Sequence, residues 1–360
     1  MDWPTLWFVL LTVVWVLFFV LEGFDFGVGA LLPLVAKDEA DRKVAINAIG
    51  PHWDANEVFL IIAGAATFAA FPAWYATLFS AFYLPLLVIV VLLILRAVAF
   101  EWRSKVESAG WRETWSRILV ACSWLLPFLW GYAVSSMLVG IPIGPDQEFA
   151  GSIGDLVSVY AALGGLAFLL LCLVHGANFL VLKTEGAVRE RARAWALRLS
   201  RPAAAVLLIY VVVTQVVGGG DWARWIAPAL AVVAAVLTFV FAHARRESYA
   251  FGSSMAAIAL TVVGFFATLY PRVLVATDPA NSLTVANASS SDLTLTVMTI
   301  VVVLLLPIIL LYMAWSYRVF RRRLSRADFG ADEPTNPFEF VAGMMGPKEP
   351  AGGQEAGGGH

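Results

Sequence analysis

The stretch PHWDANEVFLIIAGAATFAAF, residues 51–71, joins a short polar segment to an apolar run that is long enough for a membrane helix. Two carboxylates, Asp54 and Glu57, fall in its first two turns. A charged side chain in hydrocarbon costs about 2.5–3.5 kcal/mol on insertion scales, so such residues normally face the interior of a helix bundle and mark an ion path or a binding site. The stretch therefore predicts a membrane helix that carries functional acids.

The composition of the whole chain extends this prediction. Hydrophobic residues make up 60% of the sequence and charged residues 14%, with a mean hydropathy of +0.80, whereas soluble domains contain about 25% charged residues. The chain is thus predicted to be a polytopic membrane protein. With a net charge of −2 and no basic patch with interleaved aromatic residues, nucleic acid is excluded as a partner. The apolar stretch from Trp7 to Val35 is about twice as long as a signal-peptide core and has no basic flank before it, so it should remain as a helix.

Apolar runs of membrane-spanning length predict nine helices and an all-α fold. Their expected ranges are 5–35, 50–71, 75–101, 116–142, 156–183, 202–218, 224–243, 252–271 and 292–319. Pro72 and Pro271 stand where helices should stop, and Pro51 suits a first helical turn. No soluble domain fits between the spans. We expect one transmembrane domain over residues 1–328 and a disordered tail, rich in Gly, Pro and Glu, over residues 329–360.

The basic residues of the loops predict the orientation. Fifteen Lys and Arg residues fall in one set of loops, and only Arg224 and Arg272 fall in the opposite set. The tail after residue 319 is also basic, which requires an odd number of spans. We therefore expect an extracytoplasmic N-terminus and a cytoplasmic C-terminus. The Arg-rich stretch 189–193 is interpreted as a helical extension at the lipid surface that acts as a topological anchor.

The ionisable residues within the spans form a ladder that rises from the cytoplasmic side. A rise of 1.5 Å per residue places them at depths of about 6 Å for Asp54, about 8 Å for Arg96, about 10 Å for Glu57, about 12 Å for His175, about 15 Å for Asp25 and about 20 Å for Glu22. Glu22 and Asp25 are three residues apart, as are Asp54 and Glu57, so each pair shares a helix face. No comparable acid series occupies the outer halves of the spans. The pattern predicts a half-channel that carries protons to a buried acceptor.

Each of these residues also has a simpler interpretation. Asp54 could stabilise the positive end of its helix dipole, an effect that fades before Glu57. Arg96 could extend to the inner surface, although we expect it to pair with Asp54 or Glu57, because the acids need a counter-charge. His175 could be a haem ligand, a proton relay or a hydrogen-bonded core residue.

Redox cofactors are not predicted for this chain. A bis-histidine haem needs two facing histidines, and the candidates are His52, His175 and His243, of which the first and last lie at helix ends. Cys122 and Cys172 have no metal-ligand spacing and are expected to be core residues. We expect neither a bound cofactor nor a metal, and the sequence has no nucleotide-binding motif.

Taken together, several motifs resemble subunit II of the bacterial cytochrome bd-type quinol oxidases. The resemblance covers nearly the whole chain and depends on EGFDFGVG (22–29), GPHWDANEV (50–58), FAAFP (68–72) with Tyr75, FS (79–80), YLP (83–85), Arg96, FEWRSK (100–105), HGAN (175–178), KTEG (183–186) and NASS (287–290). Three positions depart from the usual pattern of the family: Ala55 replaces Gly, Phe59 replaces Trp and Glu22 replaces the Asp of many members. The replacement of Trp by Phe59 affects local packing or a bound hydrophobic ligand. Glu22 carries the same negative charge as the Asp that it replaces.

This resemblance implies two four-helix bundles plus one peripheral helix, in a heterodimer with a haem-bearing subunit I in the bacterial cytoplasmic membrane. Subunit I of such terminal oxidases carries two b-type haems and one d-type haem and oxidises quinol on the outer side. Oxygen is reduced to water with cytoplasmic protons, which makes the enzyme electrogenic without a pump. Some members hold a structural quinone in subunit II, and small single-helix accessory subunits are further expected partners, along with membrane lipids.

By this resemblance the chain is the haem-free subunit that stabilises subunit I and helps to supply protons. Asp54 is then the acid nearest the cytoplasm and Asp25 a deeper relay, with Glu57, Glu22 and His175 on the same path. The orienting or charge-pairing residues are Arg96, Trp53, Asn56 and Asn178.

Two other functions fit parts of the sequence. A proton-coupled secondary transporter would need access from both faces and usually inverted repeats, and the chain has neither a visible repeat nor an outer series of acids. A purely structural scaffold subunit would use its acids only to cap helices.

Overall fold

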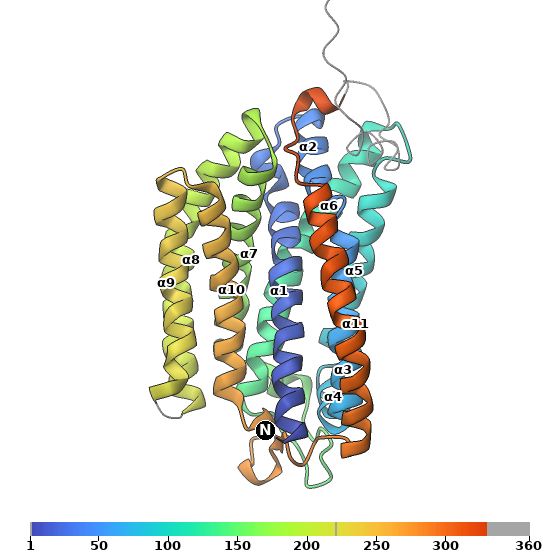
Figure 1. The fold of residues 1–360 in the computed structure, drawn as a ribbon, viewed down its shortest axis with the longest axis vertical. Coiled ribbons are helices and arrows are strands. Elements are labelled where there is room, and N and C mark those ends of the chain that lie inside the picture. The colour runs from blue at the N-terminus through green and yellow to red at the C-terminus, as the bar shows by residue number, and fades with distance from the viewer. Residues whose placement is uncertain (1, 220–221, 330–360) are drawn as a thin grey trace, which may run out of the picture.

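The computed structural model of the protein describes residues 2–219 and 222–329 (Figure 1). This part of the chain contains eleven α-helices and a small antiparallel sheet. The helices are α1 (Trp3–Val35), α2 (Glu39–Ile49), α3 (Trp53–Ala70), α4 (Pro72–Ala81), α5 (Tyr83–Trp102), α6 (Ala109–Val139), α7 (Val159–Lys183), α8 (Gly186–Gly218), α9 (Ile226–His243), α10 (Glu247–Leu269) and α11 (Asp292–Val319). The strands β1 (Arg272–Leu274) and β2 (Leu283–Thr284) pair with an irregular register in the connection between α10 and α11.

The long helices form two bundles and one outlying helix, as expected. In the described residues, eight helices are long and apolar enough to cross a membrane, or nine if the bent pair α3–α4 counts as one span. The first bundle contains α1, α3, α5 and α6, the second contains α7 to α10, and α11 lies at the edge of the first (Figure 1). Within the most apolar window of α7, 83% of residues are buried, against 6% for α11. Helix α7 is therefore central and α11 peripheral.

Several predicted helix boundaries differ from the structure, and prolines explain two of the differences. The range 75–101 is not one helix, because α4 ends at Ala81 and α5 begins at Tyr83. Pro85 explains the break, since in a continuous helix its ring would clash with the carbonyl of Ala81. The pair α3–α4 is bent by 119°, with Pro72 as the first residue of α4 and Pro51 in the turn before α3 rather than inside it.

The Arg-rich stretch 189–193 is helical, in agreement with the predicted extension, and it belongs to α8. Helix α8 begins at Gly186 rather than at residue 202. Val188, Ala192, Ala196 and Ser200 recur every four residues and are all buried, so the charged stretch contains a packing stripe. Helix α2, which the sequence analysis did not predict, begins at the N-cap Asp38, whose side chain accepts a hydrogen bond from the Asp41 amide.

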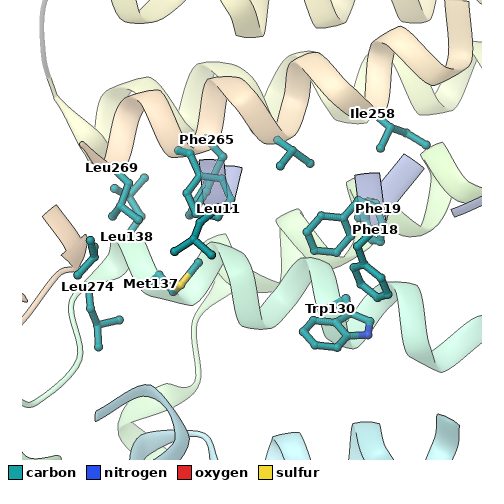
Figure 2. Packing of buried hydrophobic residues seen from close by; sticks show 14 of the residues in the cluster. Leu11, Phe18, Phe19, Trp130, Met137, Leu138, Ile258, Phe265, Leu269 and Leu274 are labelled. Carbon is teal, nitrogen blue, oxygen red and sulfur yellow. The ribbon is translucent and has the colours of Figure 1, made fainter. Parts of the chain in front are cut away.

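The hydrophobic core is built around α1, which lies between α6 and α10 (Figure 2). Phe18 of α1 contacts Trp130 of α6 edge-on, with ring centroids 5.4 Å apart. On the other side, Phe8 of α1 meets Phe266 of α10 at 5.8 Å. Cys122 and Cys172 are buried and free, as expected for small core residues.

Glycines let α1 approach α7 closely. A Cβ atom on Gly27 would lie 2.9 Å from the Cα of Gly176 and 2.8 Å from the carbonyl carbon of Cys172. Real Cβ atoms do not approach other atoms this closely, so only glycine fits at this crossing. Gly23 and Gly27, four residues apart on α1, both lie beside Cys172 of α7, and Gly27 makes the closer approach of the two.

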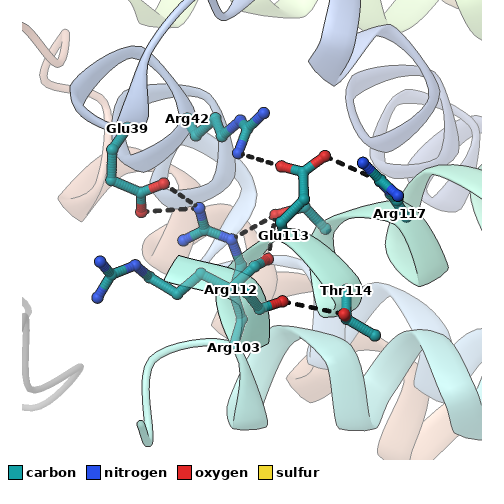
Figure 3. Close-up of polar contacts among 9 residues, drawn as sticks. Glu39, Arg42, Arg103, Arg112, Glu113, Thr114 and Arg117 are labelled. Carbon is teal, nitrogen blue, oxygen red and sulfur yellow. Dashed lines mark hydrogen bonds and ion pairs between the residues drawn. The ribbon is translucent and has the colours of Figure 1, made fainter. Parts of the chain in front are cut away.

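Ion pairs tie the elements together at the end of the molecule where α2 lies. Arg103 donates from Nη2 to both carboxylate oxygens of Glu39 at 2.7 Å and from Nε to Ser116 at 2.8 Å (Figure 3). Glu113 accepts from Arg42 at 2.8 Å and from Arg117 at 2.9 Å. The α5–α6 connection is thereby held against α2.

The segment after α11, residues 320–329, crosses this same end of the molecule, and we call it the C-terminal strap. The amide of Leu324 donates to the carbonyl of Lys183, and the amide of Glu185 donates to the carbonyl of Leu324, both at 2.8 Å. Arg323 pairs with Glu247 at 2.7 Å and Arg326 with Asp41 at 2.8 Å. Phe329, the first residue of the predicted tail, is buried. The remainder of that tail, 330–360, lies outside the described residues.

Candidate functional site: a buried acid cluster

Two acids of α1 lie in the interior of the first bundle. Glu22 and Asp25 are both 0% exposed, and their spacing of three places them on one face of α1. The surrounding side chains of α1 are almost entirely apolar, so only specific partners can offset the loss of hydration of these carboxylates. The partners come from α3 and α5.

Arg96 of α5 is the charged partner of Glu22. The two side chains form an ion pair in which Arg96 is 1% exposed and Glu22 0%. The guanidinium carbon of Arg96 also lies 4.8 Å from the ring centre of Phe26 and 5.3 Å from that of Phe100. The predicted pairing of Arg96 with Asp54 or Glu57 was therefore wrong. The depth ladder followed main-chain positions, whereas the long arginine side chain extends to a deeper acid on another helix.

Asp25 is held by an amide from α3. The side chain of Asn56 is fully buried, and its Nδ2 donates to Oδ2 of Asp25 at 2.7 Å. The other end of the amide, Oδ1, accepts from the hydroxyl of Tyr317 on α11 at 2.9 Å. The ring of Tyr317 stacks on His52 at 4.2 Å with an interplanar angle of 4°. Asn56 thus connects the buried acid to the peripheral helix.

The sequence analysis did not identify Tyr317. Tyrosines near the end of an apolar span are usually residues of the interfacial aromatic belt. The spacing of polar residues along α11 does not set Tyr317 apart from such residues. Its position four residues before the basic run 321–323 was the only indication that it lies at the depth of the α3 acids.

Asp54 and Glu57 continue from the cluster toward the end of α3. Asp54 is exposed and Glu57 partly buried. Glu57 lies within electrostatic range of Arg96, of Glu22 and of Asp54. The acids therefore form a graded series in which burial increases from Asp54 through Glu57 to Glu22 and Asp25.

Trp53 occupies an orienting position. Its ring stacks on Phe100 of α5 at 5.0 Å with an interplanar angle of 25°, and Phe100 lies against the guanidinium of Arg96. Stacked side chains therefore connect Trp53, at the start of α3, through Phe100 to the guanidinium of Arg96.

His175 and Asn178 face different partners from those of the acids. His175 is fully buried, with Nδ1 2.7 Å from the Ser254 hydroxyl and Nε2 3.2 Å from the Val20 carbonyl. Asn178 donates to the carbonyl of Val174 at 2.8 Å. The hydrogen bonds of the described residues do not connect either side chain to Glu22 or Asp25, and a role for them in proton transfer stays a prediction.

The histidine environment also bears on haem binding. Both ring nitrogens of His175 have hydrogen-bond partners, and its ring stacks on Phe251 at 4.7 Å, so it is not directed at an open coordination position. Among the described residues, no group of three or more His, Cys, Asp or Glu side chains is arranged to hold a metal ion. His175 is therefore engaged by its own hydrogen bonds and presents no free ring nitrogen to a haem iron.

The acid cluster retains unused hydrogen-bonding capacity. Oε2 of Glu22, Oδ1 of Asp25, and Nε and Nη2 of Arg96 are buried and have no hydrogen-bond partner among the described residues. Such atoms are costly in a protein interior, and they concentrate at functional sites. The cluster can therefore accept and donate further hydrogen bonds, as a proton-transfer site must.

Comparison with known proteins identifies the family. Residues 3–320 match the family described as cytochrome bd terminal oxidase subunit II. The chain belongs to this family. Cytochrome bd ubiquinol oxidase subunit 2 of Bacillus subtilis is 39% identical over 90% of this chain and 97% of its own length. Cytochrome bd-I ubiquinol oxidase subunit 2 of Escherichia coli is 33% identical over 90% of this chain and 95% of its own length.

A solved structure has the same fold. A chain in the bd oxidase of Geobacillus thermodenitrificans superimposes with a TM-score of 0.71, covering 89% of this chain and 99% of its own, at 16% sequence identity. As a member of the bd oxidase subunit II family, the protein is a multi-pass membrane subunit of a bacterial respiratory oxidase complex that contains haem and a subunit I.

Proposed function

We propose that this chain is the haem-free subunit II of a quinol:oxygen oxidoreductase that reduces O2 to water, and that it supplies protons from the cytoplasm while stabilising subunit I. The observation that carries the proposal is the pair of fully buried acids, Glu22 and Asp25, with Arg96 and Asn56 as their partners. Burying a carboxylate in an apolar helix bundle has a large desolvation cost, and ionisable residues in such positions normally have a functional role.

The graded burial of the acids supports a path from the cytoplasmic end. Asp54, at the exposed end of α3, would take up a proton, Glu57 would pass it inward, and Glu22 and Asp25 would hold it at depth. Arg96 would stabilise the ionised form of Glu22, so that the acid can accept a proton again after each transfer. The haems of subunit I would relay electrons from quinol and would provide the site at which oxygen is reduced.

The charge distribution supports the proposed orientation. The basic α2 region, the α5–α6, α7–α8 and α9–α10 connections and the C-terminal strap lie at one end of the molecule, and the N-terminus lies at the other (Figure 1). By the positive-inside rule the basic end faces the cytoplasm, so the N-terminus is extracytoplasmic in the bacterial cytoplasmic membrane. Proton uptake from this side would make oxygen reduction electrogenic.

Acid-to-amide variants of the assembled oxidase test the path. We expect Asp54→Asn and Asp25→Asn to lower quinol-driven oxygen consumption at least about tenfold, with normal haem content per complex. Glu101→Gln is the matched control. Glu101 is an exposed acid in the last turn of α5, the end of that helix that lies beside the start of α3. Asp54→Glu should keep most of the activity.

The main alternative is a purely structural subunit. Asp54 lies in the first turn of α3, where a carboxylate also stabilises the helix dipole. A structural role predicts that the amide variants lose haem and activity in the same proportion, and that result would contradict the proton path. The family match favours an oxidase subunit over a proton-coupled transporter.

We also propose that the first bundle holds a structural quinone. A cavity of about 190 Å³ lies between α1 and α3–α6, and its lining includes Trp74 and Trp130 together with the exposed side chains of Phe79 and Val90. The indole N–H groups of both tryptophans are buried without a hydrogen-bond partner among the described residues. A quinone offers two carbonyl acceptors on an apolar ring, which matches this lining.

Quinone extraction from the purified complex tests this proposal. We expect Trp74→Phe and Trp130→Phe to reduce the quinone recovered per haem, whereas the control Trp195→Phe on α8 should not. Unchanged recovery in both cavity variants would contradict a quinone at this position.

A further inference from the structure

Tyr317 is the one side chain of the peripheral helix that joins the acid cluster by a hydrogen bond. Only Leu295 and Met313 of α11 are buried in the described structure, so this helix has little packing of its own. The phenol nevertheless extends inward and donates to Oδ1 of Asn56 at 2.9 Å. Helix α11 packs loosely, so something else must hold it in place if Tyr317 is to keep this hydrogen bond to the buried site.

The C-terminal strap holds the helix in place. Three residues after Tyr317, the carbonyl of Phe320 accepts a hydrogen bond from Nζ of Lys183, and that of Arg322 accepts another at 3.2 Å. Leu324 is fully buried and bonds to Lys183 and Glu185 through its main chain. The end of α11 is thus fixed to the junction of α7 and α8. The coplanar stack on His52 fixes the ring of Tyr317 itself.

The direction of the Asn56 amide follows from its contact with Asp25. An ionised carboxylate only accepts hydrogen bonds, so Nδ2 of Asn56 faces Asp25, and Oδ1 is left to accept from the Tyr317 hydroxyl. If the amide were rotated by 180°, its oxygen would face the carboxylate oxygen of Asp25, which is repulsive while Asp25 is ionised. The hydrogen bond from Tyr317 holds the amide in the orientation in which Nδ2 donates to the Asp25 carboxylate.

We propose that Tyr317 is a positioning residue for proton transfer: through Asn56 it keeps Asp25 ready to accept a proton. This inference rests on the proposed proton path. It assigns the peripheral helix a role beyond spanning the membrane, because the strap and His52 hold the donor in place.

The test is Tyr317→Phe in the assembled oxidase. Phenylalanine keeps the stack on His52 and removes only the hydroxyl. We expect kcat to fall about fivefold, the loss associated with one hydrogen bond, with an unchanged KM for quinol and unchanged haem content. Tyr312→Phe is the matched control, because Tyr312 lies on the same helix and is 61% exposed; its kcat should stay at the wild-type value.

Two further measurements separate positioning from general structural damage. In an Asp25→Asn background, Tyr317→Phe should add no further slowing, because both changes act on one transfer step. In infrared difference spectra, the carboxyl band that Asp25→Asn removes should shift in Tyr317→Phe and stay in place in Tyr312→Phe.

The outcomes distinguish this inference from the proposed function. Normal turnover in Asp25→Asn would overturn the proton path and the role of Tyr317 with it. Slow turnover in Asp25→Asn combined with wild-type kcat in Tyr317→Phe, or with additive slowing in the double variant, would overturn the role of Tyr317 alone.

Discussion

Arg96 of α5 and Glu22 of α1 form an ion pair from which solvent is excluded, with side-chain exposures of 1% and 0%. The pair joins two helices of the first bundle at the level of the acid cluster. Removing both charges from water is costly, and their attraction offsets this cost only while both partners are present. The structure thus makes the stability of the bundle depend on the same residues that hold the site.

Breaking this pair from one side should destabilise the protein strongly. We expect Arg96→Met to lower the free energy of unfolding by about 3–5 kcal/mol, because it leaves the Glu22 carboxylate buried without a counter-charge. The measurement is denaturant unfolding of the purified complex in detergent. Arg117→Met is the control: Arg117 pairs with Glu113 at the surface and is 79% exposed, so its effect should stay within about 1 kcal/mol.

The double variant Arg96→Met/Glu22→Gln should recover part of this loss, since no isolated charge then remains. A double variant less stable than Arg96→Met would show that the guanidinium acts mainly through its contacts with Phe26 and Phe100.

The crossing of α1 and α7 predicts a second sensitive position. We expect Gly27→Ala to destabilise the protein by about 1–3 kcal/mol, because its Cβ would collide with the main chain of Cys172 and Gly176. Thermal inactivation of the complex measures this. Gly252→Ala on α10 is the matched control, since a Cβ there meets nothing within 4 Å. It should be neutral or stabilising by up to about 1 kcal/mol, and equal losses in both variants would refute the steric explanation.

The membrane spans could be predicted from the sequence because the thickness of the bilayer sets the length of each apolar run. This constraint acts on each helix separately. For the same reason it identified Glu22 and Asp25 as ionisable residues within an apolar span, whereas Asn56 was named as an orienting residue only through the family resemblance. Helix α2 was not predicted because its eleven residues are too short and too polar for that signal. The α4–α5 break depends on Pro85, which interrupts the helix without interrupting the apolar run.

The pairing of side chains could not be predicted in this way. The depth of a residue along its helix does not reveal the direction of its side chain around the helix axis. Arg96 therefore pairs with Glu22 instead of the α3 acids, and the hydrogen bonds of His175 go to Ser254 and to the Val20 carbonyl. Tyr317 belongs to the site only because the C-terminal strap holds α11 in place, and such a contact between distant segments leaves no periodic signal.

The strap itself can be released by one substitution. Leu324 is 0% exposed, so Leu324→Ala should cost about 2–5 kcal/mol locally and detach residues 320–329. Limited trypsin digestion then reports faster cleavage after Arg321, Arg322, Arg323 and Arg326. Leu311→Ala on α11, at a position 71% exposed, should be cleaved at the wild-type rate. Equal protection in both variants would mean that the strap is held by its ion pairs alone.

Asp41 of α2 predicts how stability at this end depends on pH. Burial alone would raise the pKa of its carboxyl, but hydrogen bonds from Arg326 and Arg191 and from the Lys37 amide outweigh burial and lower the pKa from 3.8 to about 2. A pKa that is lower in the folded state than in the unfolded state stabilises the fold above the unfolded value, and this stabilisation is lost as the pH falls from about 4 toward 2.

We therefore expect Asp41→Asn to be less stable than the wild type by about 2 kcal/mol near neutral pH. The difference should stay constant down to about pH 5 and shrink below pH 4, where the carboxyl binds a proton in the unfolded state while it stays ionised in the folded state until about pH 2. Unfolding midpoints measured between pH 7 and pH 3 give this curve. Asp146→Asn, an exposed loop position at the opposite end, should match the wild type throughout within about 0.5 kcal/mol. A difference for Asp41→Asn that does not change with pH would show that the variant loses packing rather than a charge.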